Sequence, residues 1–231
     1  MFLFDDVKNP PKLFVAHYYT DDEVERYFSA VDNYHSSYNR LHCIQLPVLF
    51  RILYCCGTRI GETLGIRKKD IDLESGIIRL TETKNRKERY VTMGGELLAL
   101  ARRFADRTFF QIADDEYVFR NKNGGGLKYD TIKHIHREIL AMAGIPFVGN
   151  SHGPRIHDWR HTFAIRSFKH MSDNGTDMYV ALPILSTYLG HGTIMATEHY
   201  LRLTLEMFPE IEEKMGKTAE KVFGGIVYED N

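Results

Sequence analysis

Strand-like residue patterns are confined to a short part of this 231-residue chain, and helical periodicity dominates on both sides of it. Runs typical of strands occur at residues 71–73, 77–80 and 90–93, and a shorter one at 117–119. Glu74-Ser75-Gly76 is a turn between the first two runs, and a polar connection at residues 84–89 precedes the third. We therefore expect a mainly α fold with one small antiparallel β-sheet, an α+β arrangement.

Helical spacing of apolar residues predicts the rest of the framework. Thr20 and Glu23 form a capping box, and the apolar positions behind them predict a helix from about residue 21 to 33. Residues 41–56 predict a buried apolar helix that ends at Gly57, with Pro47 near its first turns or at a kink. Further helices are expected at about 59–65, 95–106 and 129–143, and then from 157 to about 221, interrupted near residues 175, 183, 190–192 and 209.

Composition excludes several classes of protein. Apolar residues make up 43% of the chain, too many for a disordered protein. No apolar run approaches the ~20 residues of a membrane-spanning helix, and the first residues do not form a secretory signal. The three cysteines, Cys43, Cys55 and Cys56, are an odd and sparse set, which predicts a reduced, cytoplasmic setting.

The charges are unevenly distributed along the chain. The whole chain carries a net charge of −1, yet residues 1–40 and residues 202–231 each hold seven acidic and four basic residues. The central part is therefore positive by five charges, before histidines are counted. A basic centre between acidic ends allows a phosphate-facing surface, although a mixed solvated surface has the same composition.

One cluster of polar residues occurs in the sequence His157-Asp158-Trp159-Arg160-His161. On a helix, His157, Arg160 and His161 share one face. The H-x-x-x-H spacing can hold zinc, but Asp158 stands where zinc proteases place a glutamate, and Arg160 would repel a cation. An anion site is the alternative, because arginine and protonated histidine both donate to phosphate; a solvated helix end remains the third interpretation.

Two further motifs carry charged residues. Arg59 lies at the expected start of a short helix, where anions are favoured, and Glu62 can pair with it. In the 84–89 connection, a lysine can act against a phosphate as a donor or general acid, but hairpin tips are often basic simply because they are solvated. Gly124-Gly125-Gly126 lacks the lysine and helix of a nucleotide-binding loop, so we interpret it as a turn.

Taken in order, these motifs resemble the tyrosine recombinase (phage integrase) family from Thr20 to Tyr200. The first family box is matched by residues 57–66 and 70–72, and the β-hairpin lysine is matched by Lys84. The H-x-x-R-H-T-F-A box is matched by residues 157–164 without departure in its polar residues. The family's Leu-Gly-His followed nine residues later by tyrosine is matched by His191 and Tyr200, with Thr197 also in place.

The resemblance implies a catalytic site for breaking and rejoining double-stranded DNA, with Tyr200 as the nucleophile. The other implied catalytic residues are Arg59 and Arg160 on the phosphate oxygens, His191 as a third donor, His157 as general base and Lys84 as general acid. Glu62 is expected to orient Arg59, and His161 to make a structural hydrogen bond. No metal or other cofactor is needed, because cations and donors supply the charge stabilisation. Contacts to the DNA backbone are expected from residues at the hairpin: Arg86, Lys87 and Arg89.

The resemblance also implies a domain plan and a partner. Residues 1–19 are a lead-in, 20–205 the tyrosine recombinase catalytic domain, and 206–231 a C-terminal helix and tail. That tail either packs on its own domain or docks on a neighbouring protomer in a tetramer on DNA. The separate N-terminal DNA-clamping domain of the family is expected to be absent, and the segment between Phe168 and Leu185 is longer than usual.

Three other activities stay open on the sequence alone. The chain could be a type IB topoisomerase-like relaxing enzyme, a DNA-binding regulator without activity, or, more distantly, a metal-dependent hydrolase.

Overall fold

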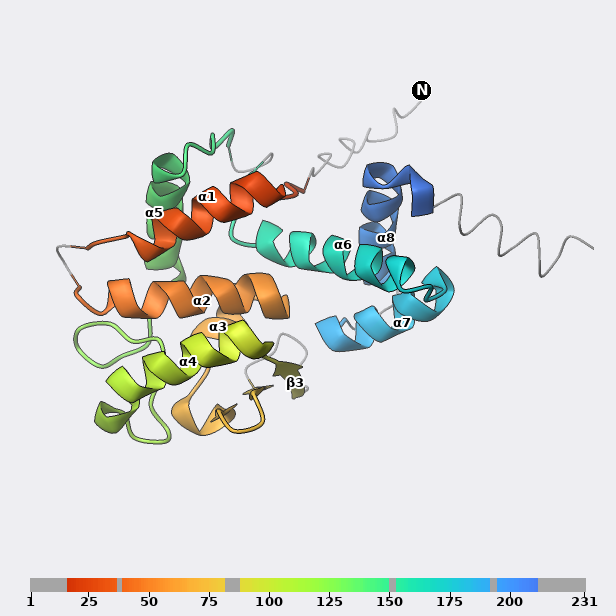
Figure 1. The fold of residues 1–231 in the computed structure, drawn as a ribbon. Coiled ribbons are helices and arrows are strands. Elements are labelled where there is room, and N and C mark those ends of the chain that lie inside the picture. The colour runs from red at the N-terminus through yellow and green to blue at the C-terminus, as the bar shows by residue number, and fades with distance from the viewer. Residues whose placement is uncertain (1–15, 37–38, 82–87, 150–152, 192–194, 212–231) are drawn as a thin grey trace, which may run out of the picture.

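The computed structural model describes residues 16–36, 39–81, 88–149, 153–191 and 195–211, and its helices and strands follow the sequence pattern closely. The longer helices are α1 (Asp21–Asp32), α2 (His42–Cys56), α4 (Gly95–Thr108), α5 (Tyr129–Met142), α6 (Asp158–Asp173), α7 (Met178–Leu189) and α8 (Met195–Met207). Three shorter ones are α3 (Ile60–Leu64), η1 (Lys68–Asp70) and η2 (Phe109–Gln111). The mainly helical expectation is confirmed (Figure 1). Within these residues, no helix is long and apolar enough to cross a membrane.

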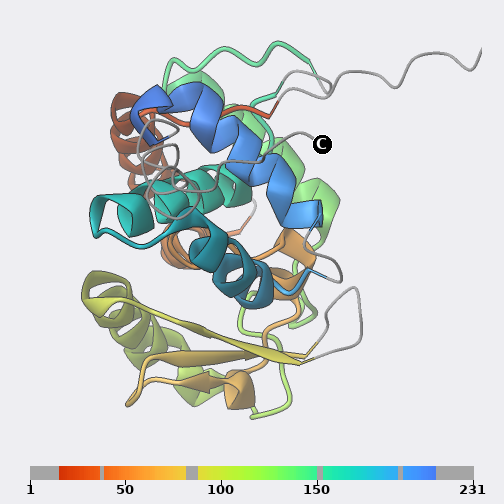
Figure 2. The ribbon, with the colours of Figure 1, turned by 90° about the vertical axis from the view of Figure 1, so that its right-hand side faces the viewer.

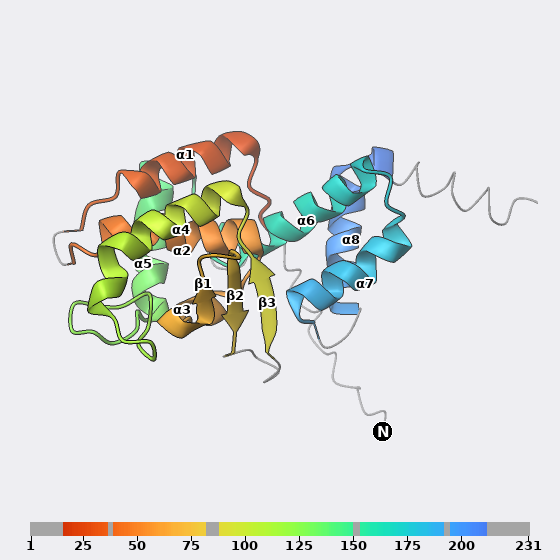
Figure 3. The same ribbon diagram turned by 60° about the horizontal axis from the view of Figure 1, so that its bottom comes forward.

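The sheet has three antiparallel strands in the order β1 (Ile71–Asp72), β2 (Ile77–Leu80) and β3 (Arg89–Thr92). The side chain of Asp72 accepts hydrogen bonds from the backbone of Glu74 and Ser75, which fixes the predicted turn between β1 and β2. β3 forms an edge of the sheet and contacts α7 (Figure 3). Lys84, Arg86 and Lys87, in the connection between β2 and β3, lie outside the described residues.

Most of the chain packs around one core, which α1, α2, α4 and α5 share with the sheet. The capping box that starts α1 is present, with the Thr20 hydroxyl accepting from the Glu23 backbone. Behind it, Tyr27 is fully buried among aromatic rings, and its hydroxyl bonds His136 of α5 at 2.6 Å. Local sequence therefore starts the helix, and burial of its apolar face holds it in the core.

α6 joins this core to a second, smaller one. Its first turns contact α2, and its later turns pack with α7 and α8 (Figure 1). Trp159, at the start of α6, is fully buried and stacks on Tyr19 with ring centroids 3.7 Å apart. The second core contains Phe168 of α6, Leu189 of α7 and Tyr200 of α8. The helix that carries the H-x-x-R-H motif therefore has its first turn fixed by the larger core.

One strand expected from the sequence pattern is not formed. Residues 117–119 do not form a strand, because only Tyr117 makes an isolated bridge, to Arg67, while Val118 and Phe119 are buried in the core. In the C-terminal segment, Phe208 and Ile211 pack against the second core. Residues 212–231 lie outside the described part of the chain.

Candidate active site

Arg160 lies at the centre of the candidate site, on the first turn of α6, with 1% of its surface exposed. Its Nη1 donates to the backbone carbonyl of Gly57 at 2.7 Å, and its Nη2 donates to that of Leu189 at the same distance. Nη2 also lies 2.9 Å from Nε2 of His191. Burial, followed by the nearby charge of Arg59, lowers the pKa of Arg160 to about 10, so the guanidinium is still charged at neutral pH.

Gly57 brings the end of α2 against α6. It has φ of 59°, in the left-handed region, and a Cβ at this position would lie 2.2 Å from a ring carbon of Phe163. A side chain here is therefore opposed by both the backbone conformation and the close approach of α6. The carbonyl that holds Arg160 is available because a glycine ends α2 at this point.

Glu62 joins two arginines from different parts of the chain. Its Oε1 accepts from Nη1 of Arg59 at 2.8 Å, and its Oε2 accepts from Nη2 of Arg89 at 2.6 Å. Oε2 also accepts from the backbone of Arg59. Burial alone would raise the pKa of Glu62, but the backbone hydrogen bond and the arginine charges outweigh it and lower that pKa. The carboxylate thus fixes Arg59, the residue that Glu62 was expected to orient.

His191 follows α7 and is linked to α8 through Thr197. Its Nδ1 lies 2.6 Å from the Thr197 hydroxyl, and its Nε2 faces Arg160. A guanidinium cannot accept a hydrogen bond, so Nε2 is the acceptor and the ring proton resides on Nδ1. Burial, followed by the charges of Arg160 and Arg59, lowers the pKa of His191 to about 4, so the ring is neutral at pH 7. A donor role toward phosphate requires the other tautomer, which the Thr197 hydroxyl can support by donating to Nδ1.

Tyr200, on α8, lies between two of the candidate histidines. Its ring is stacked on His191, with centroids 5.7 Å apart and an interplanar angle of 12°, and it lies 5.1 Å from the ring of His161. The side chain is buried, with 4% of its surface exposed. Burial raises the pKa of the phenol, while the charge and hydrogen bond of Arg160 oppose that rise. The phenol is therefore protonated in the free protein and needs activation before it can act as a nucleophile.

His157 and His161 complete the cluster at the start of α6. Their rings lie 4.9 Å apart, edge to face, and Nε2 of His161 lies 3.9 Å from the buried carboxylate of Asp158. His157 is exposed, whereas His161 is buried. Although the residue as a whole is exposed, the protein around the imidazole desolvates it, and this effect, followed by the charge of Arg160, lowers the pKa of His157 to about 4. At neutral pH its ring is therefore free of an added proton, as a general base must be.

The structure brings together all the described residues that were expected to be catalytic. Arg59 and His157 immediately precede α3 and α6, Arg160 lies on α6, His191 follows α7 and Tyr200 lies on α8. These residues meet around the end of α2. Lys84 lies outside the described residues.

Arg89 lies within the candidate site. It was expected, with Arg86 and Lys87, to contact the DNA backbone from the basic hairpin connection; in the structure only 10% of its side chain is exposed and it pairs with Glu62. The partner is 27 positions away along the chain, so no local pattern could have indicated the pair.

Sequence reasoning also gave no role to the Thr197 side chain or to two backbone carbonyls. The Thr197 position was noted within the family motif, and its contact with His191 gives it a physical meaning. Every residue has a backbone carbonyl, so nothing in the sequence distinguishes those of Gly57 and Leu189. Each of the two residues does begin a glycine-containing motif.

The arrangement is suited to binding an anion. Arg59 and Arg89 both pair with Glu62, the charge of Arg160 lies nearby, and both His157 and His191 have lowered pKa values. Positive charge near the two histidines contributes to those shifts, so the site attracts negative charge. Within the described residues, no three histidine, cysteine or acidic side chains gather as metal ligands do.

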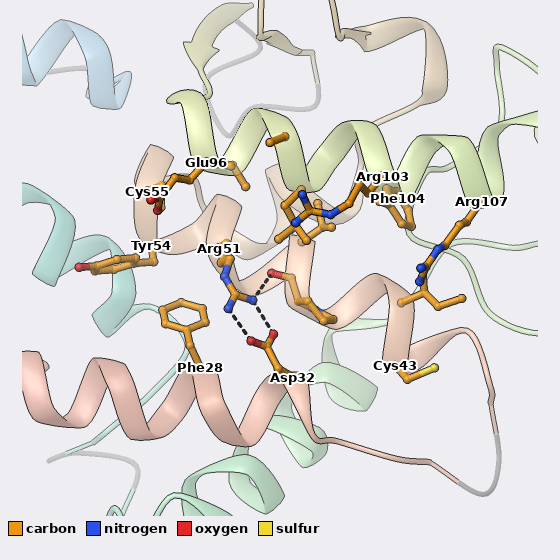
Figure 4. A pocket seen from close by; sticks show the side chains of 16 residues that line it. Phe28, Asp32, Cys43, Arg51, Tyr54, Cys55, Glu96, Arg103, Phe104 and Arg107 are labelled. Atoms are coloured by element: carbon orange, nitrogen blue, oxygen red, sulfur yellow. Dashed lines mark hydrogen bonds and ion pairs between the residues drawn. The ribbon is translucent and has the colours of Figure 1, made fainter.

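A separate hollow lies away from this cluster. It has a volume of about 720 Å³ and is lined by residues of α1, α2 and α4, including Arg51 and Asp32, which are paired at 2.7 Å (Figure 4). It contains none of the expected site residues. The candidate site is thus formed where helix ends converge rather than in this hollow.

Comparison with known proteins assigns the chain to a family. The model of the phage integrase family matches residues 17–207, so the chain belongs to the phage integrase (tyrosine recombinase) family. It is similar to y4rB of Sinorhizobium fredii, which its name classes with integrases and recombinases, with 30% identity over 220 residues. That match covers 91% of this chain and 68% of y4rB.

Solved structures of recombinases share the fold. The crystal structure of XerA recombinase matches with a TM-score of 0.64 and 24% identity over 88% of this chain and 66% of XerA. The XerH site-specific recombinase bound to its difH substrate, in a pre-cleavage complex, matches with a TM-score of 0.62 and 22% identity over 79% of this chain. The present chain corresponds to 49% of XerH. It therefore spans only part of the length of these proteins.

Proposed function

We propose that this protein is a site-specific DNA recombinase (integrase) that cleaves and rejoins DNA strands through a phosphotyrosyl bond at Tyr200. The observation that supports this most directly is the position of Arg160, which contacts both the candidate nucleophile and His191 in a site of positive charge. A phosphodiester is the anion that such donors bind, and a phenol beside them is placed to attack it.

In the proposed reaction, the Tyr200 oxygen attacks a backbone phosphorus and the bond to the 5′-oxygen breaks. The products are a 3′-phosphotyrosyl bond and a free 5′-hydroxyl. His157 accepts the phenol proton, while Arg59, Arg160 and His191 donate to the non-bridging oxygens as negative charge grows on them.

Lys84 is the proposed acid for the departing 5′-oxygen. The energy of the broken bond is retained in the tyrosine ester, so a 5′-hydroxyl from another strand can attack it and complete strand exchange. Because this chain's own donors stabilise the charge, the proposed reaction uses neither a metal nor ATP.

We also propose that double-stranded DNA is the partner and that the protein acts as a tetramer on it, in the cytoplasm. XerH, which shares the fold, is bound to its difH substrate in the solved complex. The segment 206–231 is the proposed contact between protomers. Affinity is expected to be salt-sensitive, because contacts to phosphates dominate DNA binding.

The test uses a nicked duplex with randomised sequence around the nick. Cleavage next to the nick releases a short fragment, so a 3′-phosphotyrosyl adduct accumulates and survives SDS. Native protein should form the adduct, and Tyr200→Phe should form none. The matched control is Tyr188→Phe, because Tyr188 stacks on Phe163 nearby and a phenylalanine preserves that ring contact.

Each outcome separates the alternatives. Sequencing of the trapped DNA gives the preferred site, whereas adducts without sequence preference and relaxation of supercoiled DNA would favour a topoisomerase. Binding without any adduct would favour a silent regulator. An equal yield from Tyr200→Phe would refute Tyr200 as the nucleophile, and loss of adducts on addition of EDTA would contradict the metal-free reaction.

A further inference from the structure

Arg89 occupies an unusual place for an arginine at the first position of an edge strand. Only 10% of its side chain is exposed, and its guanidinium bridges two other elements. Nη2 donates to Glu62 of α3 at 2.6 Å, and Nη1 donates to the carbonyl of Tyr188 on α7 at 3.0 Å. One side chain thus connects β3, α3 and the last turn of α7.

Both connections lead to residues of the candidate site. Glu62 holds the guanidinium and backbone of Arg59, so the contact with Arg89 fixes the position of that arginine indirectly. Tyr188 lies three residues before His191, in the turn whose next carbonyl, that of Leu189, accepts from Arg160. The position of Arg89 therefore affects site residues that come from two different elements.

The backbone after α7 is built closely around the same side chain. Gly190 has φ of 67°, and a Cβ there would lie 2.8 Å from Cδ of Arg89. A side chain at residue 190 would thus collide with Arg89. The glycine before His191 allows this close contact.

The charge of Arg89 also reaches the site. After burial and the charges of Arg160 and Arg59, the charge of Arg89 is a further cause of the lowered pKa of His191. It also contributes to the lowered pKa of Glu62. Arg89 therefore affects the site both through its hydrogen bonds and through the electrostatic effect of its charge.

We infer that Arg89 is a positioning residue: it holds Arg59, through Glu62, and His191, through the last turn of α7, in the arrangement that phosphoryl transfer requires. This inference rests on the proposed function. It gives Arg89 a role distinct from the DNA-backbone contact that its place in a basic run suggests.

The test compares Arg89→Met, Arg89→Lys and a control, Arg79→Met. Arg79 lies on the neighbouring strand β2, pairs with Asp70 at 3.0 Å and is 38% exposed, so its loss removes the same charge without touching the site. Lysine at residue 89 retains the charge but cannot form two hydrogen bonds with the fixed fork geometry of arginine.

Four quantities are measured for each variant: adduct formation at saturating DNA, DNA affinity against salt, the His191 pKa by NMR, and the melting temperature. We expect both Arg89 variants to form adducts on the order of 100-fold more slowly, the loss typical of misplaced reacting groups, with Arg79→Met near native. The His191 pKa should rise above about 4 in Arg89→Met and stay near the native value in Arg89→Lys. The slope of the logarithm of DNA affinity against the logarithm of salt concentration should be the same as for the native protein.

Three results would overturn the inference. Adduct rates within about twofold of native in both Arg89 variants would show that no positioning is needed. A salt slope reduced by about 1 in Arg89→Met would show a direct phosphate contact instead. An equal fall in the rate of adduct formation in Arg79→Met would show that loss of any nearby positive charge has this effect. If Arg89→Met unfolds, Arg89→Lys supplies the rate comparison. If native protein forms no adduct, the proposed function fails, while the His191 pKa still tests whether Arg89 controls the site.

Discussion

Replacement of Gly57 by alanine tests whether the end of α2 is built to hold Arg160. Two features of the residue oppose a side chain: its φ of 59° and the ring of Phe163, which would lie 2.2 Å from the new Cβ. The same residue supplies the carbonyl for Nη1 of Arg160. A shift of the backbone that relieves the collision would therefore also move this acceptor.

The expected magnitude combines two contributions. A left-handed conformation costs an alanine roughly 1–2 kcal/mol. Overpacking against Phe163 adds about 1–3 kcal/mol, because the ring or the backbone must move by more than an ångström. Together they predict a loss of about 2–5 kcal/mol in the free energy of unfolding, which corresponds to a fall in melting temperature of about 4–20 °C for a protein of this size.

Gly61→Ala is the matched control. Gly61 lies within α3, and no atom lies within 4 Å of the position that its Cβ would take. Alanine is favoured over glycine in a helix by about 0.5–1 kcal/mol, so this variant should be as stable as the native protein or slightly more stable. Calorimetry and urea unfolding measure both variants, and the adduct assay follows activity.

A second pair of variants separates the two costs. In a Phe163→Ala background, the added change Gly57→Ala should cost only the backbone contribution, about 1–2 kcal/mol. If Gly57→Ala in the native background costs no more than about 0.5 kcal/mol, the close approach of α6 is refuted, because ordinary surface substitutions have effects of that size.

Three further predictions concern the charges and hydrogen bonds. The pKa values of His136, about 3, and His191, about 4, are below the unfolded value, so stability should fall as pH decreases from about 6.5 toward these values, as measured by melting temperature at constant ionic strength. Thr197→Val removes the partner of Nδ1 of His191 and should cost about 1–3 kcal/mol, whereas Thr197→Ser should restore most of it. Glu62→Gln leaves two arginines without their carboxylate and should lower the free energy of unfolding in urea by about 3–5 kcal/mol. A smaller decrease than that caused by Thr197→Val would contradict this prediction.

Local sequence signals predicted the framework where local interactions decide the structure. The capping box placed the start of α1 within one residue, because Thr20 and Glu23 satisfy backbone groups only three positions apart. Gly57 marked the end of α2 because the left-handed cap favours glycine. The motif residues that resemble a recombinase site were likewise named from the sequence, since their residue types and spacing are visible there.

The remaining features depend on contacts between distant parts of the chain. The run at residues 117–119 has the apolar character of a strand, yet Phe119 stacks on Phe104 of α4 and is buried by side-chain packing instead of strand pairing. Arg89 lies in a basic run whose composition predicts solvation, but an ion pair with Glu62 draws it inward. The burial of these two side chains is determined by tertiary packing, which overrides local propensity.

The two carbonyls that hold Arg160 explain how a buried arginine can lie within a positive site. Gly57 follows the last residue of α2, and Leu189 is the last residue of α7; both helices end at a glycine in the left-handed conformation. The carbonyl ends of helices carry partial negative charge, and these two converge on one guanidinium from different directions. The fold thus offsets much of the charge of Arg160 with backbone dipoles rather than with a second carboxylate. A carboxylate at this place would repel a phosphate, whereas carbonyls hold the arginine and leave the site attractive to an anion.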